Sequence, residues 1–144
     1  MSKHPDLSSA QGRQRPKKSL GQNFLVDPNL GRKIVDALHI HPGERVLEIG
    51  PGRGALTGIL LQQAGLLVAV EKDRALAIEL KRTHPELLLV VQDAMHMDWS
   101  RLLPEPGWKV IGNLPYTIAS PLIWDLAPRA EAVRRMVFTV QKEV

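Results

Sequence analysis

Short apolar runs alternate along this chain with segments in which apolar residues recur at helical spacing. A first helix is predicted to begin at Pro28, with Asp27 as its N-cap, and to end near Ile40. Beyond it, strands are predicted at 45–49, 66–71, 87–91, 108–112 and about 135–140, and helices at 55–64, 73–83 and 118–126. Continuous apolar strands between amphipathic helices are typical of a parallel sheet covered on both faces, so the predicted fold class is α/β.

The N-terminal segment has a different composition. Residues 1–16 contain Ser, Gln, Pro, Lys and Arg with almost no large apolar residue, and we interpret them as a disordered basic arm. The net charge of +4 lies within the first 22 residues, and the rest of the chain is charge-balanced. Such an arm favours binding of a polyanion, whereas a solvated tail explains the same charge without a partner. The candidate polyanion contacts are Arg15, Lys17 and Lys18.

Composition excludes several classes of protein. The chain has no cysteine, which excludes disulfides, thiolate zinc sites and cysteine nucleophiles. Its five histidines show no spacing typical of a metal site, so no metal is expected. The longest apolar runs fall far short of the ~20 residues that span a bilayer, and the N-terminus lacks the apolar core of a secretory signal. We therefore expect a soluble, cytoplasmic protein.

A glycine-rich loop joins the first predicted strand to the helix after it, and residues 48–55 read Glu-Ile-Gly-Pro-Gly-Arg-Gly-Ala. Its glycines allow a sharp turn and close approach of a ligand, and the helix N-terminus favours an anionic group. As G-x-G-x-x-A, through Gly50 and Gly52, the loop fits a dinucleotide fingerprint. As E-x-G-x-G-x-G, it fits the S-adenosylmethionine loop of methyltransferases. No Gly-Lys-Ser/Thr follows, which excludes a Walker loop.

Two carboxylates follow the next two strands. Glu71 ends the second strand, 21 positions after Gly50, where an acidic residue accepts hydrogen bonds from ribose hydroxyls. A helix-capping role is the alternative for Glu71, but Asp73 fills that role better. Asp93 lies just past the third strand and is predicted to accept a hydrogen bond from an adenine amino group. Its alternative role is a turn former or N-cap.

The fourth predicted strand runs into Asn113-Leu114-Pro115-Tyr116. The lone pair of an exocyclic adenine amine is delocalised into the ring, which makes it a poor nucleophile. If the Asn113 side-chain oxygen and the Leu114 carbonyl each accept one N–H, that lone pair turns toward an incoming methyl group. Pro115 restricts the residue before it, and Tyr116 offers a flat surface for stacking the base. The motif therefore favours a methyltransferase, with a turn beside a core tyrosine as the alternative.

Together with KKSLGQNFL at 17–25 and Gln-Asp-Ala at 92–94, these motifs resemble the ribosomal RNA adenine N6-dimethyltransferases, above all those of the bacterial small subunit. The resemblance covers about residues 17–144, with the motifs in the family's order. It implies a Rossmann-like, class I methyltransferase fold that uses S-adenosylmethionine as cofactor. It also implies N6 dimethylation of two adjacent adenines near the 3′ end of 16S rRNA, in the immature 30S subunit, by a monomer.

The same resemblance assigns roles to individual residues. The cofactor contacts would be Asn23, Leu25, Gly50, Gly52, Glu71, Asp93 and Asn113. The glycine loop would hold the methionine end, Glu71 the ribose and Asp93 the adenine. The catalytic residues would be Asn113, Leu114, Pro115 and Tyr116, with Asn113 next to both the cofactor and the target amine.

Members of this family run to nearly twice the length of this chain, with two further strands and a C-terminal helical domain. We therefore expect residues 17–144 to be the N-terminal part of a catalytic domain, with its fifth strand as an exposed edge and weak or absent activity. Three alternatives remain at this point. They are a large-subunit adenine methyltransferase of the macrolide-resistance type, a ribosome-assembly factor with secondary or lost activity, and an NAD-dependent oxidoreductase, which leaves residues 113–116 unexplained.

Overall fold

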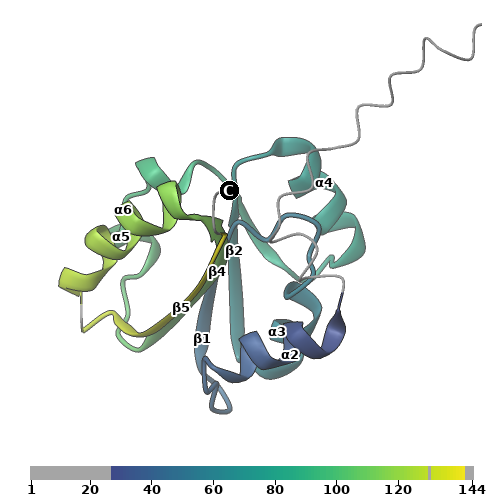
Figure 1. Ribbon diagram of the computed structural model, residues 1–144, viewed down its shortest axis with the longest axis horizontal. Coiled ribbons are helices and arrows are strands. Elements are labelled where there is room, and N and C mark those ends of the chain that lie inside the picture. The colour runs from purple at the N-terminus through teal and green to yellow at the C-terminus, as the bar shows by residue number, and fades with distance from the viewer. Residues whose placement is uncertain (1–26, 130, 142–144) are drawn as a thin grey trace, which may run out of the picture.

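The computed structural model describes residues 27–129 and 131–141 of the chain. At its centre lies a parallel sheet of five strands in the order β3-β2-β1-β4-β5 (Figure 1). The strands are β1 Arg45–Ile49, β2 Leu66–Glu71, β3 Leu88–Val91, β4 Trp108–Pro115 and β5 Val133–Gln141. The predicted α/β class is thus confirmed, and β5 forms one edge of the described sheet as expected.

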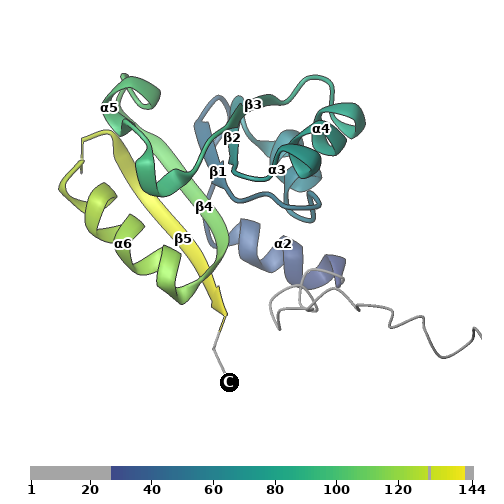
Figure 2. The same cartoon turned by 90° about the horizontal axis from the view of Figure 1, so that it is seen from above.

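Helices cover both faces of this sheet. They are α2 Pro28–Asp36, α3 Thr57–Gln63, α4 Arg74–Thr83, α5 Trp99–Leu102 and α6 Tyr116–Leu126, with single 3-10 turns η2 Ala94–His96 and η3 Ala127–Arg129. Seen from above, α2, α3 and α4 lie on one face, and α5 and α6 on the other (Figure 2). Within the described part of the chain, every helix is too short or too polar to cross a membrane.

The core consists of two apolar clusters, one on each face of the sheet. On β1, Val46 packs toward α2, α3 and α4, while its neighbour Leu47 packs toward α5 and α6. Both side chains are fully buried. Full burial stabilises the fold by about 1.5–3 kcal/mol for each such side chain. Because successive strand residues point to opposite faces, burial on both faces produces the continuous apolar runs in the sequence.

The end of β4 differs from the prediction. β4 continues to Pro115 because its parallel pairing with β5 extends to the Pro115–Gln141 pair. Pro115, with φ −57° and ψ 146°, then serves as the N-cap of α6, which begins at Tyr116 rather than near residue 118. The sequence predicted Pro121 within the first turn of this helix, but because α6 begins earlier, Pro121 lies inside it.

Two further differences concern the end of one helix and the presence of another. α2 begins at Pro28 with Asp27 as its N-cap, as predicted, but ends at Asp36 rather than Ile40. The reason is the positive φ of +50° at His39, which does not continue a right-handed helix. The short helix α5 was not predicted, because four residues are too few to give a helical periodicity.

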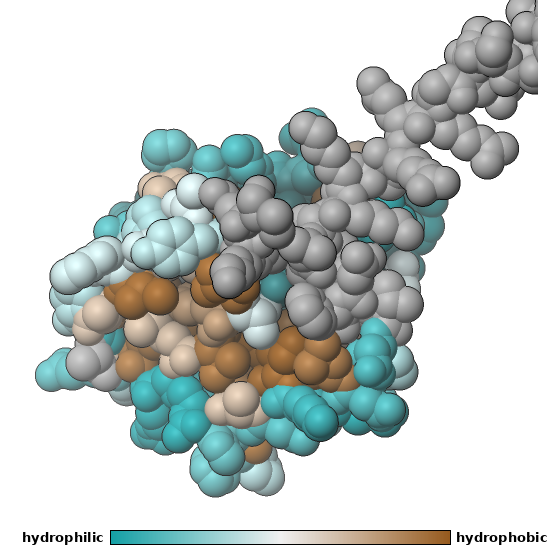
Figure 3. Space-filling view, in the orientation of Figure 1, coloured by the Kyte–Doolittle hydropathy of each residue, from teal (hydrophilic) through white to brown (hydrophobic). Residues whose placement is uncertain are grey.

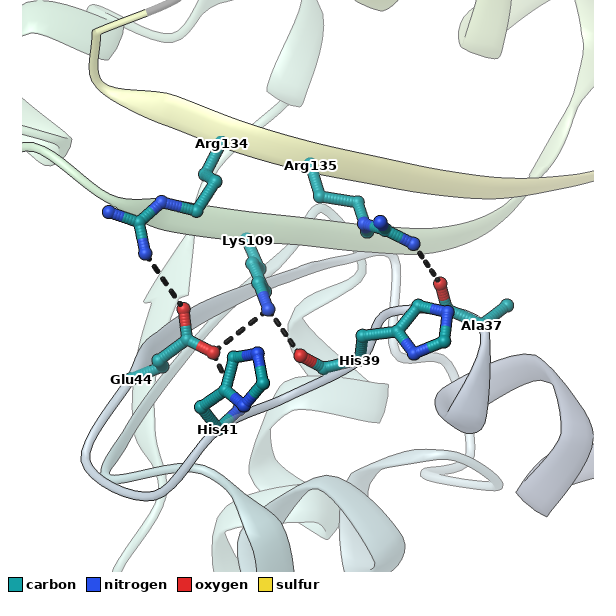
Figure 4. A network of polar contacts seen from close by, with 7 residues as sticks. All are labelled: Ala37, His39, His41, Glu44, Lys109, Arg134 and Arg135. Atoms are coloured by element: carbon teal, nitrogen blue, oxygen red, sulfur yellow. Dashed lines mark hydrogen bonds and ion pairs between the residues drawn. The ribbon is translucent and has the colours of Figure 1, made fainter.

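A polar network around the buried Lys109 holds the segment between α2 and β1 against the sheet (Figure 4). Lys109 on β4 is buried, and its Nζ donates to Glu44 Oε1 at 2.8 Å and to the carbonyl of His39. The hydrogen bond from Lys109 holds the pKa of Glu44 below its ordinary value. Arg134 and Arg135 on β5 add an ion pair to Glu44 and a hydrogen bond to the Ala37 carbonyl, at 3.6 and 3.1 Å. The network therefore fixes the entry into β1 relative to β4 and β5.

Replacing Lys109 by Met is expected to lower the free energy of unfolding at pH 7 by about 3 kcal/mol, because the Glu44 carboxylate loses its buried partner. Since the pKa of Glu44 is lowered, this stabilisation is present above its ordinary value of 4.5 and is lost as the pH falls through the folded-state pKa. Urea unfolding at several pH values measures both effects. The control Arg134→Met removes an exposed charge and should cost less than about 1 kcal/mol. A Lys109→Met loss no larger than this control would contradict the interpretation.

Candidate functional site

The carboxyl ends of the strands lie together along one side of the sheet, its carboxyl edge, which is distinct from the edge strand β5. The strand order reverses there between β1 and β4. The β1–β4 register ends at the pair Ile49–Gly112, so β4 runs three residues past β1. Those three residues, 113–115, lie beside the glycine loop that follows β1. Open α/β sheets bind their ligands at such a switch point, outside the carboxyl ends of the strands.

The glycine loop needs glycine for two different reasons. Gly50 and Gly52 have φ values of +67° and +56°, which strain any residue with a Cβ. A Cβ at Gly50 would also lie 2.9 Å from Cδ2 of Leu114, so the loop packs directly under the residue that follows Asn113. A Cβ at Gly52 would meet only the Gly50 carbonyl oxygen, at 4.0 Å, and otherwise open space. The backbone at Gly52 is therefore accessible to a ligand.

Glu71 connects the end of β2 to this loop. Its Oε1 accepts a hydrogen bond from the Gly52 N–H at 2.9 Å, and its Oε2 accepts one from the Asp73 N–H at 2.8 Å. Asp73 caps α4, as predicted, by accepting from the amides of residues 75 and 76. Among the described residues, each oxygen of Glu71 accepts one hydrogen bond and keeps a second acceptor site, so this buried carboxylate can also accept hydrogen bonds from the hydroxyls of a ribose.

Glu48 begins the glycine-loop motif, and the sequence alone indicates no role for it. The structure buries it completely, and its Oε1 accepts a hydrogen bond from Thr57 Oγ1 at 2.7 Å. Burial, and to a smaller extent the charge of Glu71, raises the pKa of Glu48 to about 7, although the bond from Thr57 opposes the shift. The signal in the sequence was a carboxylate inside the otherwise apolar end of the strand RVLEI.

Asp93 follows β3 at the same edge of the sheet and caps the turn η2. Its Oδ1 accepts from the Met95 N–H at 3.0 Å, and its Oδ2 lies 3.6 Å from Nζ of the exposed Lys72. The backbone hydrogen bond is the main cause that lowers the pKa of Asp93, and the charge of Lys72 adds to it. The alternative role, that of an N-cap, is therefore present, and the contact with adenine stays a prediction.

The four residues of the β4 motif have different environments. The side chain of Leu114 is buried against the loop, whereas Tyr116 is 62% exposed at the start of α6. Asn113 is half-buried, and its Oδ1 accepts a hydrogen bond from Thr139 Oγ1 at 2.6 Å. Sequence reasoning missed Thr139, because only the β4–β5 register places it opposite Asn113.

The structure therefore gathers most of the predicted site at one edge of the sheet. Gly50, Gly52, Glu71 and Asn113 lie around the switch point, and Asp93 follows the neighbouring strand. The other predicted contacts lie outside the described residues: Arg15, Lys17, Lys18, Asn23 and Leu25. In residues 27–129 and 131–141, no group of three or more acidic or histidine side chains is arranged to hold a metal ion.

Comparison with known proteins identifies the relatives of the chain. Residues 13–144 match the model of the family described as ribosomal RNA adenine dimethylase. The chain is 50% identical over 135 residues to ribosomal RNA small subunit methyltransferase A of Maridesulfovibrio salexigens. That match covers 93% of this chain and 51% of the relative. The chain thus spans about half the length of the curated relatives it matches.

Solved structures agree with this match. A dimethyladenosine transferase from Plasmodium falciparum aligns with a TM-score of 0.70 and 29% identity, over 81% of this chain and 42% of that one. The 23S rRNA methyltransferase ErmE aligns with a TM-score of 0.68 and 32% identity, over 81% of this chain and 48% of that one. The predicted Rossmann-like methyltransferase fold is confirmed.

Glu48→Gln tests the buried carboxyl group of this site. Because the pKa of Glu48 is raised from 4.5 to about 7, its contribution to stability is full below pH 4.5 and is lost as the pH rises through 7. Gln stays neutral throughout. The free energy of unfolding of the variant should therefore rise by about 3 kcal/mol relative to that of the wild type between pH 4 and pH 8. Urea unfolding at both pH values measures this gain. The control Glu79→Gln, on the exposed side of α4, should show no such gain. If the free energy of unfolding changed with pH in the same way for both variants, the raised pKa of Glu48 would be excluded.

Proposed function

Because this chain belongs to the ribosomal RNA adenine dimethylase family, we propose that it is the N-terminal part of an S-adenosylmethionine-dependent rRNA adenine N6-dimethyltransferase. The observation that carries the proposal is the position of Asn113 just past the end of β1, beside the glycine loop held by Glu71. The proposed target is the pair of adjacent adenines near the 3′ end of 16S rRNA in the immature 30S subunit. The names of the relatives near 50% identity favour the small subunit.

The residues at the carboxyl edge fit this cofactor. When bound, S-adenosylmethionine supplies a methyl group on a positively charged sulfur. The open space beside Gly52, whose N–H already donates to Glu71, would leave room for the methionine end, and the remaining acceptor sites of Glu71 would bind the ribose hydroxyls. Asp93 would receive the adenine amino group. Asn23 and Leu25 are proposed to contact the cofactor from the N-terminal segment.

The protein's contribution to the reaction is mainly orientation. The Asn113 side-chain oxygen and the Leu114 carbonyl would each accept one N–H of the target amine and turn its lone pair toward the methyl group. Tyr116, exposed beside them, would stack on the base, which stabilises binding by about 1–3 kcal/mol. Orientation of this kind lowers a barrier by up to ~7–11 kcal/mol. The methylated amine then loses its proton to water.

The substrate and the rest of the enzyme would meet the chain on further surfaces. We propose that Arg15, Lys17 and Lys18 contact RNA phosphates.

Figure 3 shows apolar side chains gathered on the side of the molecule where β5 runs between α6 and α2 in Figure 1. The exposed large apolar residues of α6 and β5 are Tyr116, Ile123, Trp124 and Val140. The proposed further strands of a longer catalytic domain would cover the β5 edge, with the chain working as a monomer.

The methylation of RNA fragments tests the proposed function. Because the N-terminal part alone is expected to have weak or absent activity, the assay uses the protein at the full length of its relatives. With labelled S-adenosylmethionine, this full-length protein is expected to methylate adenines of a 16S 3′-end fragment in preference to a 23S fragment. Asn113→Ala should reduce the rate at least about 100-fold, because the target amine loses an acceptor that orients it. The control Asn29→Ala changes an exposed residue at the start of α2 and should leave the rate unchanged.

Three outcomes of this experiment would count against the proposal. Label in the 23S fragment alone would favour the large-subunit alternative. RNA binding without any methylation would favour an assembly factor. A rate that is the same in the wild type and in Asn113→Ala would exclude the assigned role of Asn113.

A further inference from the structure

Thr139 makes a direct contact with the proposed catalytic side chain from a neighbouring strand. It lies on β5 in register with Asn113 on β4, so both side chains lie on the same face of the sheet. Both residues are half-buried, and the hydroxyl of Thr139 donates to Asn113 Oδ1 at 2.6 Å. Thr139 therefore donates to the same oxygen that would accept an N–H of the target amine.

A carboxamide side chain needs such a restraint. Rotation about its last torsion exchanges an acceptor oxygen for a donor NH2 group, and this torsion is only weakly restricted by the side chain itself. An adenine amine offers N–H donors, so Asn113 helps only when its oxygen faces that amine. The observed bond from Thr139 to Oδ1 restrains this torsion and leaves a second acceptor site on the same oxygen.

The sheet itself does not need this hydroxyl. β4 and β5 are paired from Trp108 to Pro115, with one irregularity between Trp108 and Lys109, and backbone hydrogen bonds join such strands whatever their side chains. On this face of β5 the residue two positions earlier is Val137, which packs against the apolar cluster. A valine at position 139 would keep the same shape and an equally strong preference for a strand. The hydroxyl is therefore explained by Asn113 rather than by packing.

We propose that Thr139 is a positioning residue whose hydroxyl holds the Asn113 carboxamide with its oxygen toward the target adenine amine. The inference rests on the proposed function, because this orientation matters only if Asn113 meets an amine. Thr139 itself touches neither the cofactor nor the substrate in this account and acts only through Asn113.

Two substitutions at this position separate positioning from packing. Thr139→Val keeps the methyl group and the branched shape but removes the hydroxyl, whereas Thr139→Ser keeps the hydroxyl and removes the methyl group. Positioning predicts that Val lowers kcat for methylation of the 16S fragment about 5- to 10-fold with KM unchanged, and that Ser stays near the wild type. A packing role predicts the reverse order. The control Thr83→Val removes a hydroxyl bonded to the Glu79 carbonyl on α4 and should leave kcat unchanged.

A double substitution and a spectroscopic readout complete the test. In the Asn113→Ala background, Thr139→Val should cause no further loss, because its effect passes through Asn113. In the NMR spectrum of the free protein, the side-chain NH2 signals of Asn113 should shift toward those of an unrestrained asparagine in Thr139→Val but not in Thr139→Ser. These signals do not depend on activity. If the full-length wild type transfers no methyl groups, the proposed function fails while the NMR comparison still decides the role of Thr139.

Unchanged Asn113 signals in Thr139→Val would overturn the proposal. A kcat for Thr139→Val equal to that of an active wild type would overturn it as well.

Discussion

The carboxylate of Glu71 joins two loops that would otherwise be independent. It ends β2, and its two oxygens accept the N–H groups of Gly52 in the loop after β1 and of Asp73 at the start of α4. Charge-assisted hydrogen bonds of this kind are about twice as strong as neutral ones. The position of the glycine loop, and with it the packing of Leu114 over Gly50, depends on this contact. The site at the switch point is thus organised by one buried charge.

That charge also affects which ligands suit the site. Glu48 and Glu71 lie close enough for the charge of Glu71 to contribute, after burial, to the raised pKa of Glu48. A ligand that brings positive charge to this edge is stabilised by the carboxylates, whereas a pyrophosphate would add negative charge beside them. S-adenosylmethionine carries positive charge at its sulfur and at its amino group and negative charge at its carboxylate, so its net charge is positive. The electrostatics of the site therefore agrees with the cofactor that the family match implies.

The sequence predicts most reliably the features that depend on neighbouring residues. The strands RVLEI and LLVAVE have the predicted bounds, because burial on both faces requires continuous apolar residues. The helix N-cap at Asp73 was predictable because it needs only the Asp73 side chain and the amides two and three positions after it. The position of Glu71 at the end of its strand was predictable from the apolar run that it closes, although the bond to Gly52 was not.

Features that depend on strand pairing could not be predicted in the same way. The extension of β4 through Asn113, the start of α6 at Tyr116 and the contact from Thr139 all follow from the register between β4 and β5. No local pattern encodes that register. The bond between Glu48 and Thr57 likewise needs the loop to fold back, because nine positions separate the two residues.

The binding of S-adenosylmethionine, measured by titration calorimetry, tests most directly whether Glu71 organises a cofactor site. The wild type and the control Glu79→Ala, which changes an exposed residue of α4, should bind it with equal affinity. Glu71→Ala should bind it at least about tenfold more weakly, because a charged acceptor is lost. NAD should give no measurable heat with any of the three proteins. Binding of NAD instead, or an affinity of Glu71→Ala equal to the wild type, would contradict this account.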